Sequence, residues 1–250
     1  MPCATSRIMW FMIGIISDIH GNHAALSAVL AELDRLGVDE IICLGDTAGY
    51  YSEINACCDA LRARGIFSLM GNHDAYIARR EPCPRSNSAN ACLDYQHKVI
   101  SAANRAWLES LPERASLHGL ELIHGGWNDP LDEYLEPSDA YFAERPGRFF
   151  ASGHSHVQYL WHGNGKTWCN PGSVGQPRDG DPRAAFATWD GQAFTLHRIA
   201  YDIQAAQRAM AQAGFTDYFY DNLAKGTQIG GRISAIRSDQ APPAPAGNRP

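Results

Sequence analysis

The chain has 250 residues, a length that suits one large domain or two small ones. Hydrophobic residues make up 45% of it and charged residues 19%, a balance that excludes an intrinsically disordered protein. The formal net charge of −6 argues against a nucleic-acid polymer as partner, because sequence-independent binding of that kind needs a basic surface.

The cysteines and the apolar runs predict the cellular location of the protein. Seven cysteines are scattered without a CxxC pair, which is typical of reduced thiols in a cytoplasmic protein. No apolar run reaches the roughly 20 residues of a transmembrane helix, so we expect no membrane partner. Residues 8–16 are mostly apolar but lead into Asp18 and His20 without a cleavage site, which argues against a signal peptide. Residues 1–7 are predicted to be a loose leader.

The first predicted strand, residues 12–16, is followed by Asp18-Ile19-His20. An acid and a histidine separated by one residue at the carboxyl end of a strand can face one Zn, Mn or Fe ion. Taken alone, such a pair is more often a helix cap in a polar loop. The weight of this motif therefore depends on what recurs downstream.

The next segments alternate between strand and helix patterns. A helix capped by Asn22 should end at Gly37, and residues 40–44 predict a second strand that leads to Gly45-Asp46. A helix over about 52–64 precedes a third strand over 66–70, which leads to Gly71-Asn72-His73-Asp74. This alternation predicts a mostly parallel sheet with right-handed crossovers.

The second half of the chain has a different pattern. Residues 75–110 are predicted to be a largely helical excursion over or beside the site, and residues 129–145 a further loop and helix. Strands over 120–123 and 149–152 lead to His124 and to Gly153-His154-Ser155-His156. Four short strands separated by turns favour antiparallel pairing, and they cover residues 157–161, 166–169, 184–189 and 193–199. Helices over 202–213 and 217–224 would close a single domain over 8–225, followed by a mobile tail over 226–250.

Metal-binding residue types therefore recur after five predicted strands. Five of the ten histidines fall in these turns, and glycines flank them, which lets the backbone turn sharply beside a bound group. Any one of these residues could be an ordinary loop residue. Because all five turns place metal-binding residue types at strand ends of one predicted sheet, we favour a single functional site.

In this order, the motifs resemble those of the calcineurin-like metallophosphoesterases. The match covers residues 12 to about 200, and it is most similar to the small bacterial branch with YfcE-type phosphodiesterases. The matching blocks are Asp18-Ile19-His20, Gly45-Asp46, Gly71-Asn72-His73-Asp74, His124 and Gly153-His154-Ser155-His156. The resemblance implies a four-layer α/β/β/α sandwich and an enzyme that hydrolyses a phosphodiester or a nucleotide polyphosphate.

The resemblance also implies the ligands of two divalent cations. Asp18, His20 and His156 would hold one ion, and Asn72, His124 and His154 would hold the other. Asp46 would bridge them, and a hydroxide between the ions would attack phosphorus. Oxygen and nitrogen ligands favour Mn, Fe or Zn without choosing among them.

His73 and Asp74 would be catalytic residues in this scheme. His73 would protonate the leaving oxygen or stabilise its developing charge. Asp74 would either orient His73 or cap the following helix. Protein phosphatases of this superfamily carry a further acidic residue where this chain has Gly49. This difference argues against a protein phosphatase, and it leaves the partner of His73 undetermined.

Two residues are candidates for substrate contact. Tyr50 could stack on a nucleobase or could pack within its loop. Arg178 could contact phosphate or could form a surface ion pair with Asp179 or Asp181. The alternatives to a small-molecule phosphoesterase are a serine/threonine-type protein phosphatase and a catalytically silent metal-binding scaffold, and the presence of all seven ligand positions argues against the scaffold.

Overall fold

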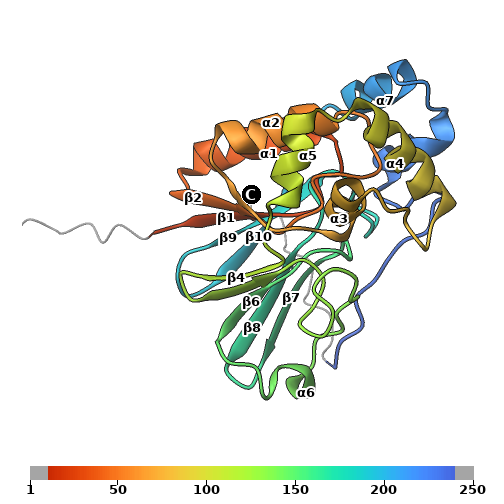
Figure 1. Cartoon of the computed structure of the whole chain (residues 1–250). Helices are drawn as coiled ribbons and strands as arrows, with labels where there is room; N and C mark the ends of the chain where they lie inside the picture. The colour runs from red at the N-terminus through yellow and green to blue at the C-terminus, as the bar shows by residue number, and fades with distance from the viewer. Residues whose placement is uncertain (1–10, 240–250) are drawn as a thin grey trace, which may run out of the picture.

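Two mixed β-sheets pack face to face, and helices cover the outer face of the first (Figure 1). The computed structural model describes residues 11–239, so the predicted leader over 1–7 lies outside the described residues. The first sheet has the strand order β10-β9-β1-β2-β3, and the second has the order β4-β5-β6-β8-β7. This arrangement confirms the predicted α/β sandwich.

The strands of each sheet combine parallel and antiparallel pairs. In the first sheet β1, β2 and β3 are parallel, while β9 runs antiparallel to both β1 and β10. The strands of this sheet are β1 (Ile13–Ile16), β2 (Glu40–Cys43), β3 (Phe67–Ser68), β9 (Ala184–Trp189) and β10 (Phe194–Ile199). In the second sheet β5, β6 and β8 are parallel, and β4 and β7 are antiparallel edge strands. Its strands are β4 (Arg114–Leu117), β5 (Leu120–Ile123), β6 (Phe149–Ala151), β7 (Gln158–Gly163) and β8 (Lys166–Pro171).

The helices begin and end at the kinds of residue that the sequence indicates. Asn22 accepts a hydrogen bond from Ala25 N at 3.1 Å at the start of α1, and Gly37 ends that helix with φ at 69°. The α-helices are α1 (His23–Leu36), α2 (Ile54–Ala63), α3 (Asn72–Arg79), α4 (Asn87–Val99), α5 (Ala102–Glu109), α6 (Asp139–Phe142) and α7 (Ile203–Gln212). Two 3-10 helices follow, η1 (Asp217–Phe219) and η2 (Asp221–Lys225). None of the helices within residues 11–239 is long and apolar enough to cross a membrane.

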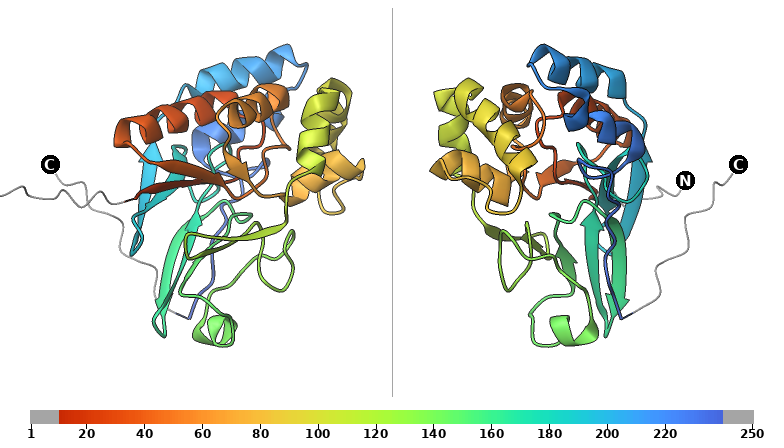
Figure 2. Two further views of the ribbon diagram at one scale, coloured as in Figure 1. Left: turned by 60° about the vertical axis from the view of Figure 1, so that its left-hand side comes forward. Right: turned by 90° about the vertical axis from the view of Figure 1, so that its right-hand side faces the viewer.

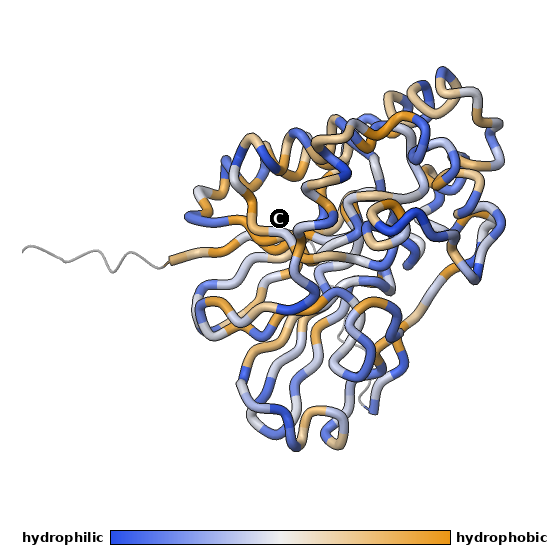
Figure 3. Tube along the Cα trace, in the orientation of Figure 1, coloured by the Kyte–Doolittle hydropathy of each residue, from blue (hydrophilic) through white to orange (hydrophobic). Residues whose placement is uncertain are grey.

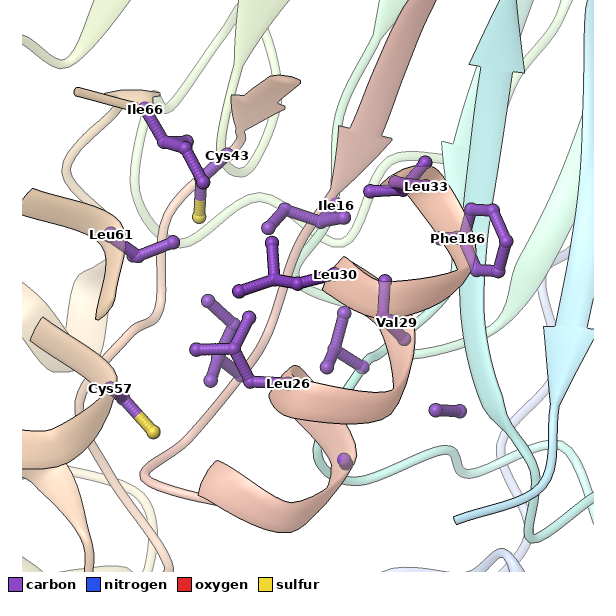
Figure 4. Close-up of a cluster of buried hydrophobic side chains, with 14 residues drawn as sticks. Ile16, Leu26, Val29, Leu30, Leu33, Cys43, Cys57, Leu61, Ile66 and Phe186 are labelled. Atoms are coloured by element: carbon purple, nitrogen blue, oxygen red, sulfur yellow. The ribbon is translucent and has the colours of Figure 1, made fainter. Parts of the chain in front are cut away.

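Alternating side chains of β1 build two separate cores. Ile13 and Ile15 face the second sheet, whereas Ile16 packs against α1 and α2 in the cluster that Figure 4 shows. Gly14 lies under α1, where an added Cβ would meet Leu33 Cδ2 at 2.7 Å, so this glycine allows close approach of helix and strand. Figure 3 shows the hydrophobic colouring along β1 and on the helix sides that turn toward it.

The outer face of the second sheet has a thinner cover than the first. Phe150, Trp161 and Trp168 form a cluster there with Phe142 of α6. Ile236, from the segment after η2, packs against the same cluster. The fourth layer of the sandwich therefore consists of one short helix, loops and part of the C-terminal segment.

The structure differs from the sequence prediction in the pairing of the late strands. They pair antiparallel as predicted, but β7 and β8 join the second sheet, while β9 and β10 return to the first. The predicted third strand over 66–70 is shorter, because Met70 N donates to Pro112 O at 2.8 Å instead of continuing the sheet. Of the tail predicted to be mobile over 226–250, residues 240–250 lie outside the described residues. Residues 226–239 lie against the body and hydrogen-bond to it, and mobility stays a prediction.

Candidate metal centre

Five loops meet at one end of the sandwich, where strands of both sheets have their carboxyl ends. The loops after β1, β2 and β3 come from the first sheet, and those after β5 and β6 come from the second, so the prediction that all five strand ends belong to one sheet was wrong. Backbone hydrogen bonds join the loops, from Asp18 N to Gly45 O at 3.0 Å and from Gly153 N to His124 O at 2.9 Å. The packing of one sheet on the other therefore completes the site.

Most of the predicted ligands have a left-handed backbone. Nine non-glycine residues within 11–239 have positive φ, and five of them are predicted ligands: Asp18, His20, Asp46, His154 and His156. A non-glycine residue in this region costs of order 1–3 kcal/mol, which persists only where the surroundings enforce it. This concentration of strain at one edge is typical of a functional site.

The first ligand group consists of Asp18, His20, Asp46 and His156, all buried. His156 Nε2 lies 3.2 Å from Asp18 Oδ1, and His20 Nε2 lies 3.5 Å from Asp46 Oδ2. The Nε2 atoms of His20 and His156 are 2.9 Å apart. Donors that share one ion at about 2.1 Å lie about 3.0–3.4 Å from one another, so these spacings suit a cation between them.

The second ligand group consists of Asp46, His124 and His154, with Asn72 beside them. His124 Nε2 lies 3.4 Å from Asp46 Oδ2 and 3.2 Å from Asn72 Oδ1. His154 Nδ1 lies 3.1 Å from the same amide oxygen. Asp46 belongs to both groups, as the resemblance implies for a shared carboxylate.

Backbone carbonyls fix the rings of three histidines. The Nδ1 atoms of His20, His156 and His124 lie 2.7, 2.7 and 3.0 Å from the carbonyl oxygens of Ala48, Gln176 and Leu44. A proton on Nδ1 that donates to a carbonyl leaves Nε2 with a free lone pair directed at the centre. This is the arrangement expected for neutral imidazole ligands.

The polar atoms at the centre fit a bound cation. Asp18 Oδ1 and His154 Nε2 are buried and accept or donate no hydrogen bond among the described residues. Burial lowers the pKa of His20 and of His154 well below the usual range, so both rings are neutral ligands near pH 7. Burial also opposes the charged form of His124, yet the Asp46 carboxylate outweighs it and raises the pKa of His124 to about 9. The centre thus favours a positive charge, and a cation would supply it.

His73 lies at the start of α3 and borders the centre. Its backbone N donates to Asp46 Oδ1 at 2.8 Å, and its Nδ1 is buried without a hydrogen-bond partner among the described residues. Its ring packs between the rings of His20 and Tyr50, with centroids 5.0 and 4.9 Å away. Burial lowers the pKa of His73 to about 4, so the ring is neutral near pH 7 and has an N–H to donate. This state suits stabilisation of developing charge better than full proton transfer.

Asp74 does not orient His73 in this structure. Its carboxylate accepts hydrogen bonds from the backbone N atoms of Gly71, Asp46 and Ala48 at 3.0, 2.8 and 2.8 Å. It therefore caps α3 and ties the helix to the Asp46 loop. Of the two interpretations left open, capping is the one that the contacts support, and the predicted catalytic role of Asp74 is corrected to a positioning role.

A cavity of about 330 Å³ opens over the centre. Asp46, Asn72, His73, His154 and His156 line its floor, and Tyr50 and Arg178 line its side. Seven of the predicted site residues thus line one cavity. The other four, Asp18, His20, Asp74 and His124, do not line it.

Arg178 lies inside this cavity rather than on the surface. It is only 5% exposed, and its guanidinium donates to Gln176 Oε1 and lies 5.2 Å from the Tyr50 ring centroid. The two acids considered as its partners pair elsewhere, Asp179 with Arg198 and Asp181 with Arg183. No carboxylate within salt-bridge distance neutralises Arg178 among the described residues, which leaves its charge available to an anion.

Tyr50 packs against its neighbours in the way that the loop-packing alternative describes. Its ring centroid lies 4.7 Å from that of His20, and its residue borders the cavity. Stacking on a nucleobase stays a prediction.

Gln96 is a supporting residue that the sequence does not reveal. This buried residue of α4 accepts from Gly49 N at 2.7 Å and donates to the carbonyl oxygens of Gly49 and Tyr51. It holds the loop that follows Asp46. No local motif marks a glutamine in mid-helix, so only its contacts identify it.

The structure also explains Gly49. Its φ is +98°, and a Cβ there would lie 2.5 Å from His73 Nδ1 and 2.8 Å from His20 Nδ1. A side chain at this position would collide with both rings, so the further acid of the protein phosphatases has no room here.

Comparisons with known proteins agree with this geometry. The family described as "Calcineurin-like phosphoesterase superfamily domain" matches residues 11–192 of this chain. An uncharacterized protein of Methanocaldococcus jannaschii is 32% identical, and the match covers 86% of this chain and 98% of that protein. The crystal structure of a metallophosphoesterase from Sphaerobacter thermophilus has a TM-score of 0.76 at 33% identity and covers 86% of this chain and 99% of its own. A hypothetical protein from Pyrococcus horikoshii has the same fold, with a TM-score of 0.79 at 17% identity, over 86% of this chain and 98% of its own.

Proposed function

Since the chain belongs to the calcineurin-like phosphoesterase superfamily, and phosphoesterases hydrolyse phosphoric esters, we propose that it uses two divalent cations to hydrolyse a phosphodiester or a nucleotide polyphosphate. One observation carries the proposal: two buried ligand groups share Asp46 at the floor of a cavity that also holds the unneutralised Arg178. A shared carboxylate is what two neighbouring cations need.

The residues divide between the two ions by position. Asp18, His20 and His156 would hold one ion, and Asn72, His124 and His154 would hold the other, with Asp46 between them. When bound, the ions supply Lewis acidity toward phosphate oxygens and lower the pKa of a nearby water. The donors are oxygen and nitrogen atoms without a thiolate, which supports Mn, Fe or Zn.

The chain's own residues would bind and orient the phosphate. Arg178 would bind a non-bridging oxygen, since a guanidinium matches phosphate geometry. His73, one residue after the ligand Asn72, would donate its N–H to the leaving oxygen and stabilise the charge that develops there.

The dimensions of the site support a small substrate. A cavity of about 330 Å³ is at the lower end of the range typical of small-molecule sites. The collision that Gly49 avoids argues against the acid that a protein phosphatase would add. The complete ligand set argues against a silent scaffold.

Hydrolysis assays with matched variants test the proposal. The wild-type protein, loaded with Mn²⁺, is compared on a chromogenic phosphodiester, the corresponding monoester, a dinucleoside tetraphosphate and a phosphopeptide. Asp46→Asn and His73→Ala are the test variants, and His162→Ala, at an exposed histidine of β7, is the matched control. Metal content per chain is measured for each protein.

We expect two ions per wild-type chain and turnover of the diester or the dinucleotide. Asp46→Asn should lose metal and activity, and His73→Ala should keep metal and lose most activity, while His162→Ala should change neither. Turnover of the phosphopeptide alone would favour the protein phosphatase. Two bound ions without turnover of any substrate would favour the scaffold.

The cysteines support a reducing compartment. All six described cysteines are free and buried: Cys43, Cys57, Cys58, Cys83, Cys92 and Cys169. We therefore propose a cytoplasmic location, where thiols stay reduced.

A further inference from the structure

A second hollow of about 360 Å³ adjoins the cavity over the candidate metal centre. Tyr134, Gln228 and Arg232 line both spaces, so the two are adjacent compartments with a common wall. The second compartment is otherwise lined by Ser155 and by residues 233–235. A ligand held at the metal centre could extend past the common wall into it.

Two of the three wall residues, Gln228 and Arg232, belong to the C-terminal segment, residues 226–239. Figures 1 and 2 show this dark-blue segment running from the 3-10 helices along the second sheet toward α6. Ser234 N donates to Arg178 O at 2.7 Å, and Trp161 Nε1 donates to Asp239 Oδ1 at 3.0 Å. Between these anchors and η2, Gln228 N donates to Arg232 O at 2.9 Å and closes a turn. The segment therefore holds Arg232 at the mouth of the metal cavity.

Arg232 has a positive charge that the described residues do not neutralise. Its guanidinium donates to the neutral Gln228 Oε1 at 3.0 Å and forms no salt bridge within residues 11–239. Arg85, which also lines the cavity, differs because it pairs with Asp132. Arg178 and Arg232 thus provide two separate unneutralised cations, one deep in the cavity and one at its outer end. Two such positions suit a ligand with at least two anionic groups in a row.

The second compartment also has an apolar rim. Tyr134 is 55% exposed and Ile233 is 60% exposed, and both line the compartment. The Tyr134 ring lies 4.3 Å from the His154 ring, between centroids, so it reaches from a metal ligand to the outer hollow. Because both side chains line the same hollow, they offer a ligand a shared apolar contact surface there. A planar heterocycle is a group that stacks on a tyrosine ring.

From these contacts we propose that residues 228–234 and Tyr134 form a nucleoside-binding compartment for a nucleoside polyphosphate. Its reacting phosphate lies at the metal centre beside Arg178, a further phosphate contacts Arg232, and the base lies between Tyr134 and Ile233. This inference rests on the proposed function, because it takes the metal centre as the place of the reacting phosphate. It names the substrate class that the hydrolase would prefer over small diesters.

Binding measurements test the compartment without turnover. Titration calorimetry compares α,β-methylene-ADP, methylenediphosphonate and inorganic phosphate on metal-free and Mn²⁺-loaded protein. The charge is tested with Arg232→Gln, and its matched control is Arg237→Gln, because Arg237 is exposed on the same segment but does not line either compartment. Arg232→Gln should weaken the nucleotide analogue and methylenediphosphonate about tenfold and leave inorganic phosphate unchanged. Arg237→Gln should change none of them.

The base contact is tested with Tyr134→Ala and Ile233→Ser. Both should weaken α,β-methylene-ADP by about five- to tenfold and leave methylenediphosphonate, which lacks a base, unchanged. Because Tyr134 packs against His154, metal content is measured for Tyr134→Ala, and Ile233→Ser tests the contact if metal is lost.

Two results would overturn the inference. One is unchanged affinity for α,β-methylene-ADP in Arg232→Gln, and the other is equal weakening of inorganic phosphate. If the chromogenic diester is still hydrolysed, either result removes the compartment and leaves the proposed function standing. Arg232-dependent binding of the nucleotide analogue without hydrolysis of any ester would support the compartment and remove the proposed function.

Discussion

Substitution of Gly49 by alanine tests whether packing around this residue positions the catalytic rings. The new Cβ would lie 2.5 Å from His73 Nδ1 and 2.8 Å from His20 Nδ1, well inside van der Waals contact. The His73 ring cannot retreat easily, since it is 5% exposed and is flanked by the rings of His20, Tyr50 and Tyr76. The substitution must therefore displace at least one ring of the centre.

The backbone adds a second cost, and a matched variant separates the two. Gly49 has φ at +98°, and Gly191, in the turn between β9 and β10, has φ at +94° with nothing within 4 Å of its added Cβ. A left-handed non-glycine residue costs about 1–2 kcal/mol. Overpacking of a full interior costs about 1–3 kcal/mol more. We therefore expect the free energy of unfolding to fall by about 1–2 kcal/mol in Gly191→Ala and by about 2–5 kcal/mol in Gly49→Ala.

Denaturation of the metal-free proteins measures these costs, and metal content and hydrolysis measure the effect on the centre. Gly191→Ala should bind metal and turn over substrate as the wild type does. Gly49→Ala should lose metal from the site of His20 and lose at least tenfold in activity. Equal stability of the two variants together with full activity of Gly49→Ala would refute the argument from packing.

Three further predictions concern the cations and the supporting residues. Chelation should abolish hydrolysis and lower the melting temperature, because ions that bind only the folded chain, at 100 times their Kd, stabilise it by about 2.7 kcal/mol. Added Mn²⁺ should restore both the activity and the melting temperature. Activity that survives exhaustive dialysis against a chelator would contradict a metal mechanism. Gln96→Leu should lower the free energy of unfolding by at least about 2 kcal/mol in urea denaturation, since it leaves polar backbone atoms of Gly49 and Tyr51 buried without partners. A change below about 0.5 kcal/mol, the size of an ordinary surface effect, would contradict it. Gln176→Glu should raise KM for the anionic substrate about tenfold, because a carboxylate would neutralise Arg178. An unchanged KM would argue against phosphate binding there.

The sequence by itself determined which residues meet at the candidate metal centre. Asp18, His20 and Asp46 follow short apolar strands, and so do His154 and His156. Three of these residues, His20, Asp46 and His154, stand directly beside a glycine. Strand, turn and ligand are neighbours in the chain, so a local pattern records all three. The helix caps at Asn22 and Gly37 were predictable for the same reason.

Only the tertiary structure decided how the supporting residues act. Gln96 bonds to Gly49 across 47 residues, and no local pattern encodes such a contact. Asp74 could cap or orient, and only the positions of Gly71, Asp46 and Ala48 favour the cap. The distribution of the strand ends over two sheets, and the return of Arg232 to the mouth of the cavity, depend on how distant segments pack. Packing is a property of the whole chain, because each long-range contact is fixed by the many others that bring its partners together.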